Sequence, residues 1–368
     1  MTAERTLSQR ELNRATLARQ LLLERGDLPV SEAIERVAGL QAQAPAPPFA
    51  GLWTRLRDFD PDELRRLIAA REVVRATMMR HTVHLMTTRD YLRFRGPIQP
   101  ALERMFGGIT SGRVQPDELA LAVDAARERF AERPHTFAEI RALIAELLPD
   151  ADHSALAYGV RTHLRLVAQP TDGRWCYTGT APYALADRFL RRPIPADTDA
   201  RELIRRYLAA FGPATVADVQ AWSGLAGLKP VVEALRPKLR TFRDERGREL
   251  FDVPDGPLPD ADTPAPARFL ADWDNTILSH ADRTRVVADE HRKQIVKAAR
   301  VYATFLIDGV VAGIWRIEKE GRAVTLVVQP FRRLAKAERA ALTEEAEPLV
   351  RFVRPEAAGH GVRFAAAA

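Results

Sequence analysis

The stretch Pro213-Ala-Thr-Val-Ala-Asp-Val-Gln-Ala-Trp222 joins a proline, a threonine two residues later and a short amphipathic helix. Two other stretches repeat this pattern, Pro29-Val-Ser-Glu-Ala-Ile-Glu-Arg-Val37 and Pro134-His-Thr-Phe-Ala-Glu-Ile-Arg-Ala-Leu143. The serine or threonine stands where its hydroxyl can cap the first turn of the helix, and Thr136 with Glu139 matches a full capping box. The repeat therefore predicts three related helical units in one chain.

The residues around each copy extend the pattern in the same order. A longer helical pattern precedes each copy, at residues 11–25, 116–132 and 200–210. Another helix-like stretch follows, and then residues that alternate between apolar and polar. Helix, short capped helix, helix and hairpin is the order of a winged helix, in which the second and third helices form a helix-turn-helix and the hairpin is the wing.

The third copy gives the clearest expectations: a short helix over 216–223, a recognition helix over 230–236 and a hairpin over 239–253 with its tip at 245–248. In the second copy, the third helix is expected at 154–164 and the hairpin at 166–177, with Asp172-Gly173 as the turn. The first copy is distorted, since prolines interrupt it. We expect its second helix to end at 41–43, a proline-rich segment to intervene before 49–57, its third helix at 61–70 and its hairpin at 73–86.

A proline- and aspartate-rich stretch, 254–266, is typical of a linker. Beyond it, residues 299–308, 310–319 and 323–328 alternate or run apolar between glycines, and 334–351 is an amphipathic helical pattern. We therefore expect an α+β protein with three tandem winged-helix domains and a small C-terminal β-barrel or antiparallel sheet. The expected boundaries are 1–98, 99–195, 196–256 and 257–368.

The composition excludes several classes of protein. The chain has 368 residues, 46% of them hydrophobic and 28% charged, which is ordinary for a water-soluble globular protein. No apolar run reaches the roughly 20 residues of a membrane span, and the N-terminus lacks a signal peptide. Cys176 is the one cysteine, so neither an intramolecular disulfide nor a cysteine metal cluster can form. We expect a cytoplasmic monomer, bound to the nucleoid when on DNA, without metal or cofactor.

Arginine dominates the charge of the chain. The net charge is +6, and only six of the 55 basic residues are lysines. Arginine binds phosphate bidentately and stacks on bases, which favours a nucleic-acid partner. A GC-rich genome that encodes arginine in place of lysine explains the same composition equally well, because the 49 acidic residues are interspersed and no basic tail exists.

The run Leu40-Gln41-Ala42-Gln43-Ala44-Pro45 places two glutamines two residues apart, just before a proline-rich break. On a helix the two side chains would diverge, but in an extended segment they face the same way, and the coming prolines favour extension. A glutamine amide can orient a water molecule but is a poor base and nucleophile. A polar turn that faces water is the alternative interpretation of this short run.

Two other stretches carry candidate site residues. In 75–85, Arg80, Thr82 and His84 are expected on one face of a wing strand, and with Arg75 and His81 they could donate to DNA phosphates. An ordinary solvated hairpin is the alternative. The loop 273–283 holds Asp274, Asn275 and His280 and is either part of a DNA-binding site or a well-bonded joint between domains.

Together these stretches resemble a known family. The Gln-Ala-Gln run, the following Leu52-Trp-Thr-Arg-Leu56, the Met-Arg-His-Thr-Val-His-Leu strand and the Trp-Asp-Asn…Ser-His-Ala-Asp-Arg loop are similar to those of the bacterial AlkZ-type DNA glycosylases. The resemblance covers nearly the whole chain. It implies tandem winged helices, a C-terminal β-barrel, and release of alkylated purines, in some members with unhooking of interstrand crosslinks. The family's catalytic Gln-x-Gln pair falls on Gln41 and Gln43, whereas a related branch has an acidic second residue.

The expected activity is hydrolysis of the N-glycosidic bond of an N7- or N3-alkylated purine in double-stranded DNA. Alkylation makes the base cationic, so the bond is weak and the leaving group needs no proton. Gln41 and Gln43 would hold the attacking water through their carbonyl oxygens. Two alternative functions remain open: a non-enzymatic winged-helix DNA-binding regulator, and an inactive scaffold that kept the fold.

Overall fold

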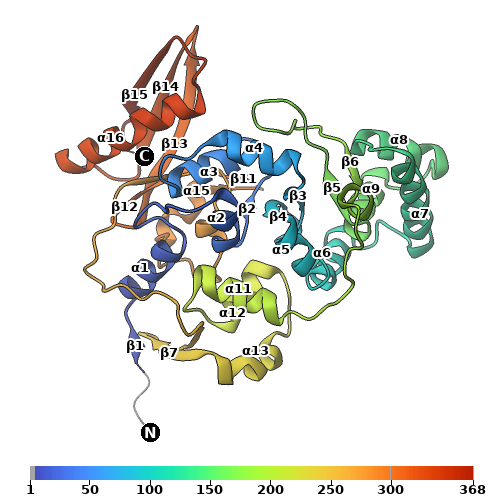
Figure 1. Ribbon diagram of the computed structural model, residues 1–368, viewed down its shortest axis with the longest axis horizontal. Coiled ribbons are helices and arrows are strands. Elements are labelled where there is room, and N and C mark those ends of the chain that lie inside the picture. The colour runs from blue at the N-terminus through green and yellow to red at the C-terminus, as the bar shows by residue number, and fades with distance from the viewer. Residues whose placement is uncertain (1–4, 299, 368) are drawn as a thin grey trace.

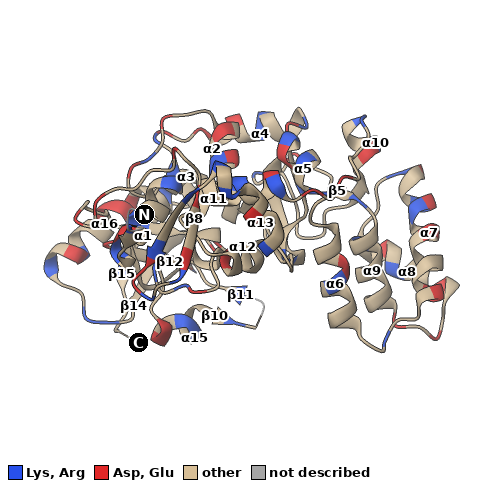
Figure 2. Cartoon of the chain, turned by 90° about the horizontal axis from the view of Figure 1, so that it is seen from below, with Lys and Arg blue, Asp and Glu red and all other residues tan. Residues whose placement is uncertain are grey.

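The computed structural model describes residues 5–298 and 300–367. The protein is mixed α+β and elongated, with the C-terminal sheet toward one end and helices α7 (Pro116–Glu132), α8 (Phe137–Leu147) and α9 (His153–His163) at the other (Figures 1 and 2). Basic and acidic residues are interspersed over the elements (Figure 2). No helix in the described part is long and apolar enough to cross a membrane.

The N-terminal part alternates short helices with a hairpin. Its elements are β1 (Thr6–Leu7), α1 (Gln9–Arg19), α2 (Val30–Arg36), β2 (Leu40–Gln41), α3 (Pro47–Arg55), α4 (Pro61–Ala69), β3 (Val73–Thr77), a 3₁₀ turn (Met79–His81), β4 (Val83–Thr87) and α5 (Thr88–Phe94). The expected helix over 61–70 and hairpin over 73–86 are confirmed.

Two expected helix ends in this part were wrong. Helix α1 stops at Arg19 rather than at residue 25, because Leu21 takes a left-handed conformation (φ 56°) and the Leu22 N–H closes back on the Leu17 carbonyl. Helix α2 stops at Arg36, before the glutamine pair, and Gly39 follows with φ 83°. The chain then leaves the turn as strand β2, so Gln41 lies on a strand and not at a helix end.

The second part holds α6 (Gln99–Thr110), α7, α8, α9, β5 (Leu166–Ala168), β6 (Tyr183–Leu185) and α10 (Ala186–Leu190). Helix α7 has the expected bounds, and α8 begins with the expected Thr136–Glu139 capping box. The expected hairpin at 166–177 was wrong. Asp172 and Gly173 do lie in a tight turn, where the Cys176 N–H bonds to the Gly173 carbonyl, but the strand that pairs with β5 is β6, after a long irregular connection.

One five-stranded sheet joins the hairpins of these two parts. Its strand order is β2-β4-β3-β5-β6, and β3 meets β5 at the single residue pair Ala76 and Val167. One apolar cluster also spans both parts, since it contains Ile34 and Phe49 together with Phe130 and Leu156. The strand with Gln41 is therefore the edge of a sheet whose other edge lies in the second part.

The third part follows its expectations closely. It contains α11 (Arg201–Phe211), α12 (Val216–Ser223), α13 (Lys229–Leu235), a 3₁₀ turn (Arg236–Lys238), β7 (Arg240–Asp244) and β8 (Glu249–Asp252). Thr215 and Asp218 form the capping box at the start of α12, and Gly224, with φ 80°, ends that helix. Strand β1 joins β7 in parallel, so three strands form this sheet.

The expected linker 254–266 has no helix or strand, as predicted, but it is bound along its length. The Arg14 Nε donates to the Thr263 carbonyl at 2.6 Å, the Arg10 Nε to that of Ala261 at 2.7 Å, and an Arg19 Nη2 to that of Pro257 at 3.1 Å. All three arginines belong to α1, so the segment is a strap that crosses the first helix.

The C-terminal part contains β9 (Arg268–Leu270), α14 (Asn275–Leu278), a 3₁₀ turn (Asp289–His291), α15 (Arg292–Ile295), β10 (Val296–Lys297), β11 (Arg300–Val301), β12 (Thr304–Ile307), β13 (Val310–Glu320), β14 (Ala323–Pro330), α16 (Lys336–Val353) and β15 (Gly359–Phe364). Strands 310–319 and 323–328 and the last helix are confirmed. The first residue of the expected strand at 299–308, Ala299, lies outside the described residues.

The expected antiparallel sheet is confirmed for β12, β13 and β14, whereas the alternative of a barrel was wrong. The sheet order β15-β14-β13-β12-β9 is linear and open in the described residues, and β15 pairs with β14 in parallel. A parallel pair needs a crossover connection, and α16 supplies it. This helix packs on the sheet through Leu342, Ala346 and Leu349.

Candidate active site

The glutamine pair lies on an extended segment that runs along β4. Gln41 is the register partner of His84, and the Ala42 N–H donates to the Val83 carbonyl at 2.7 Å. The following prolines then begin α3. The expected extension at the pair is therefore present.

Both glutamine side chains turn toward the tip of the β3–β4 hairpin. The Gln41 Oε1 accepts a hydrogen bond from an Arg80 Nη2 at 2.9 Å, and the Gln43 Oε1 accepts one from the Val83 N–H at 3.0 Å. A guanidinium and a backbone N–H can only donate, so they fix which end of each amide faces inward. Each carbonyl oxygen keeps a second lone pair, and neither Nε2 bonds to another described residue.

The two glutamines differ in exposure. Gln41 is only 6% exposed, whereas Gln43 is exposed to solvent. Gln43 is therefore the member of the pair that a substrate can reach directly, and Gln41 lies beneath it.

Arg75 holds the backbone of the pair instead of facing solvent. Its Nε donates to the Ala42 carbonyl at 2.9 Å and its Nη2 to that of Gln43 at 3.4 Å. Its guanidinium also lies 5.4 Å from the ring centroid of Tyr177. Burial lowers the pKa of Arg75. A buried guanidinium that is occupied in this way cannot contact a DNA phosphate in this conformation.

Arg80 lies at the hairpin tip, with φ 54°, and touches three parts of the chain. Besides Gln41, it donates to the Trp222 carbonyl at 2.9 Å and to the Asn275 Oδ1 at 3.1 Å. Burial, and then the nearby Arg283, lower the pKa of Arg80 to about 10. Among the described residues no carboxylate forms an ion pair with it.

The expected polar face of Arg80, Thr82 and His84 on one strand was wrong. Arg80 and His81 have φ values of 54° and 58°, so they form a tight turn and only His84 lies on β4. The Thr82 Oγ1 donates back to the Met79 carbonyl at 2.9 Å, which keeps it within the turn.

Both histidines of this hairpin are buried and neutral near pH 7. The His81 Nε2 lies 2.8 Å from the Thr162 Oγ1, and its ring stacks on Tyr158 with the centroids 4.3 Å apart. Burial lowers the pKa of His81 to about 4 and that of His84 to about 3. Neither side chain reaches the surface to meet a phosphate.

The loop 273–283 is a bonded joint in the structure. Asp274 pairs with Arg55 through two hydrogen bonds of 2.8 Å, and both side chains are buried. The Asn275 Nδ2 donates to the Gly39 carbonyl at 3.0 Å, and the His280 Nε2 lies 3.1 Å from the Phe211 carbonyl. Of the three predicted site residues here, the structure brings only Asn275 into contact with the glutamine site, through Arg80.

Two contributors to the site were missed from the sequence. The Trp222 backbone carbonyl holds Arg80, and nothing in a sequence pattern marks a carbonyl as an acceptor. Arg283 ends the quoted loop, and its Nε is buried without a hydrogen-bond partner in the described residues. Because arginines are so frequent in this chain, the residue type alone does not mark Arg283 as part of the site.

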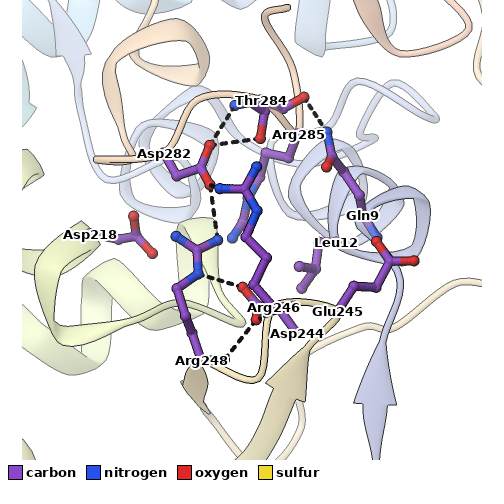
Figure 3. Close-up of a pocket in the computed structure, with 10 residues that line it drawn as sticks. All are labelled: Gln9, Leu12, Asp218, Asp244, Glu245, Arg246, Arg248, Asp282, Thr284 and Arg285. Carbon is purple, nitrogen blue, oxygen red and sulfur yellow. Dashed lines mark hydrogen bonds and ion pairs between the residues drawn. The ribbon is translucent and has the colours of Figure 1, made fainter. Parts of the chain in front are cut away.

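A small polar pocket away from the glutamine pair lies at a contact between two parts of the chain (Figure 3). It encloses about 40 Å³ where the tip of the β7–β8 hairpin meets the C-terminal part. Asp282 accepts from Arg246 at 3.0 Å and from Arg248 at 2.9 Å, as Figure 3 shows. This volume holds one or two water molecules, so a nucleobase cannot enter.

A larger groove begins just after the glutamine pair. It encloses about 560 Å³, within the usual range for ligand sites, and its lining starts at Ala46 and Pro47. Trp175 and Tyr302 add aromatic rings, and the guanidinium of Arg300 lies 4.9 Å from the Tyr302 ring centroid. The groove thus combines aromatic rings with mostly basic side chains, and neither Gln41 nor Gln43 is among its lining residues.

Comparison with known proteins agrees with this arrangement. A curated protein of Streptomyces sahachiroi, the "Interstrand DNA cross-link repair glycosylase", is 26% identical over 350 residues, covering 86% of this chain and 88% of that protein. The solved structure of the Streptomyces sahachiroi DNA glycosylase AlkZ superposes with a TM-score of 0.80 at 20% identity, covering 98% of this chain and 100% of the other, and so has the same fold.

The family model "DNA glycosylase AlkZ-like" matches residues 34–352, which include the glutamine pair, the β3–β4 hairpin and the joint at Asp274. That range is most of the chain. The protein therefore belongs to the AlkZ-like family of DNA glycosylases, which are hydrolases of N-glycosyl bonds.

Proposed function

We propose that this protein hydrolyses the N-glycosidic bond of N7- or N3-alkylated purines in double-stranded DNA, including purines joined in an interstrand crosslink. The observation that carries the proposal is the fixed pair of amides, Gln41 and Gln43, both bound to the β3–β4 hairpin. The name of the Streptomyces relative, which refers to crosslink repair, supports the crosslinked substrate.

The chemistry fits a site without an ionisable group at its centre. An alkylated purine already carries a positive charge and leaves as a neutral base, so no acid has to protonate it. The site then has to place a water molecule below the sugar carbon and tolerate the positive charge that develops there. The free lone pairs of the two amide oxygens can accept hydrogen bonds from such a water molecule.

The same contacts favour a monofunctional glycosylase. A lyase step needs an amine that attacks the sugar carbon. Among the described residues, neither glutamine side chain bonds to a lysine, and the partners of the pair are a guanidinium and a backbone N–H. We therefore propose that a water molecule, and not an amine of the protein, attacks the sugar carbon.

We further propose that the chain binds DNA as a monomer through three winged-helix units, 1–98, 99–195 and 196–256, followed by a β-rich unit, 257–368. Two short bridges support this division. Ala214, just before α12, pairs with Phe251 on β8, and His135, just before α8, pairs with Tyr183 on β6. In both parts the residues before the second helix thus join the second strand of the hairpin.

The test measures release of N7-methylguanine from a methylated duplex under single-turnover conditions. Gln43→Ala is expected to slow release by about 100-fold, the usual cost of losing a group that positions a reactant. Duplex affinity should change little, because the exposed amide makes no ion pair. Gln9→Ala is the matched control, since Gln9 is also exposed but lies on α1, where its amide donates to the Thr284 carbonyl.

Equal release by wild type and Gln43→Ala would remove this residue from the mechanism. Wild-type protein that binds DNA and releases no base, while enriching one palindrome from a random pool, would replace the enzyme with a sequence-specific regulator.

A further inference from the structure

Arg80 is a half-buried cation whose hydrogen-bond acceptors are all neutral oxygens. Its three acceptors are the Gln41 side chain on β2, the Trp222 backbone on α12 and the Asn275 side chain on α14, at 2.9, 2.9 and 3.1 Å. None of them carries a charge. Removing even part of a guanidinium from water without a carboxylate partner costs free energy, so a role other than stability would explain its place here.

The neighbouring arginine shows what a carboxylate would do. Arg55 meets Asp274, one residue before Asn275, and the two form a bidentate pair with both distances at 2.8 Å. Such a pair engages both terminal nitrogens of the guanidinium. Because residue 275 is an amide, Arg80 keeps one Nη2 shared between Asn275 and Gln41.

A guanidinium suits this task because it cannot lose its proton and presents donors in a rigid plane. It therefore accepts only one orientation of the Gln41 amide, with the oxygen toward Arg80 and the nitrogen away from it. Without that donor the amide could rotate by half a turn, and both orientations would be populated.

We propose that Arg80 is a positioning residue that locks the orientation of the Gln41 amide, and that Asn275 and the Trp222 carbonyl hold its guanidinium in place. This inference rests on the glycosylase activity proposed above. It also replaces the expected phosphate contact of Arg80 with a role that acts through Gln41.

The first test is kinetic. Arg80→Met and Asn275→Asp are expected to slow single-turnover base release by about tenfold, and Arg80→Lys by less, with duplex Kd changed by less than about twofold. In Asn275→Asp, the new carboxylate draws Arg80 into an ion pair and away from Gln41. Arg165→Met is the matched control, because Arg165 is also half-buried and donates to a carbonyl, that of Ile194 at 2.6 Å.

A merely structural role for Arg80 predicts that Arg80→Met leaves the rate of the folded protein unchanged, and that result would overturn the proposal. Asn275→Asp also loses the hydrogen bond from the Asn275 Nδ2 to the Gly39 carbonyl, so its rate is compared with that of Arg80→Met. All rates are measured well below each variant's unfolding midpoint, so that loss of folded protein does not contribute.

The second test does not depend on activity. With glutamine side chains labelled with ¹⁵N, the Gln41 amide signal is identified by its absence in Gln41→Glu. We expect this signal to shift in Arg80→Met and Asn275→Asp and to stay unchanged in Arg165→Met. An unchanged signal in Arg80→Met would show that Arg80 does not determine the orientation of the Gln41 amide. An inactive wild type with the expected shifts would instead refute only the proposed reaction.

Discussion

At the scale of single residues, the site is organised by groups that can only donate. Arg80 and the Val83 N–H fix the two glutamine oxygens, and Arg75 fixes the backbone between them. The reacting groups are therefore neutral amides, while the charges lie behind them. The pH dependence of this protein should then come from its stability more than from its site.

Buried histidines make that pH dependence predictable. Burial lowers the pKa of His280 to about 3, against about 6.5 in an unfolded chain. Between these values the unfolded chain binds more protons than the native protein, so the free energy of unfolding falls as the pH falls below about 6.5. His280→Asn should flatten this slope by up to about 1.4 kcal/mol per pH unit, measured by urea unfolding between pH 6.5 and 4.5.

A wild-type free energy of unfolding that is constant over this pH range would contradict the assignment of His280 as neutral in the native protein.

The sequence predicted the glutamine pair and its extended backbone, because the prolines after it disfavour a continued helix. It could not predict the neighbours of the pair. The left-handed backbone at Arg80 and His81 turns the first side chain toward Gln41 and the second toward Tyr158. Asn275 comes from a distant part of the chain, and only folding brings it to Arg80.

At the scale of elements, the capping residues determine where the short helices begin. The Thr215 Oγ1 accepts from the Asp218 N–H at 3.1 Å, and the Asp218 carboxylate accepts from the Thr215 N–H at 2.9 Å. Asp218 also accepts from the Ala281 N–H at 2.9 Å. The cap of α12 thus connects this helix to the loop after α14.

Thr215→Ala is expected to lower the free energy of unfolding by about 1–2 kcal/mol, the cost of losing an N-cap whose partner, Asp218, is buried. Thr343→Ala is the control, since Thr343 lies inside α16, is half-buried and bonds to the Arg339 carbonyl of its own helix. Equal unfolding midpoints for the two variants would show that the cap adds nothing.

Elements with strong local signals were predicted well. Helices α7 and α12 have the expected bounds because a proline or a capping box marks each start. Strand β6 was missed because its partner lies across a long connection, and the Asp172-Gly173 turn between them closes only a local loop. Turn residues predict a turn, but they do not predict which strands pair.

At the scale of the whole molecule, buried contacts join the N-terminal and C-terminal parts. Thr54 and Arg55, at the end of α3, bond to Phe269 and Asp274. The strap over α1 and the joint in Figure 3 add further contacts between distant segments. We expect these parts to unfold as one cooperative unit.

Asp274→Asn removes the charge that compensates Arg55. Because both side chains are buried, we expect a loss of about 3–5 kcal/mol in the free energy of unfolding, measured with urea. Asp282→Asn is the control, since its partners Arg246 and Arg248 are 63% and 42% exposed and such pairs contribute less than about 1 kcal/mol. Similar losses in both variants would contradict this assignment.

The mixed α+β class and the position of the strap followed from composition and helix pattern. The linear strand order of the C-terminal sheet could not be predicted, because alternating residues predict strands but not the order in which they pair. Strand β15 was not expected at all, and its short stretch with two glycines gives a weak strand signal.

The sheet β2-β4-β3-β5-β6 has a mechanical consequence. Its two edges lie in different parts of the molecule, and its halves meet at the single pair Ala76 and Val167. A duplex that pushes on helices α7–α9 would tilt β5, and that tilt would reach the hairpin that holds both amides through this pair and through the contacts of His81 with Thr162 and Tyr158 on α9. A force applied to α7–α9 would thereby change the positions of Gln41 and Gln43.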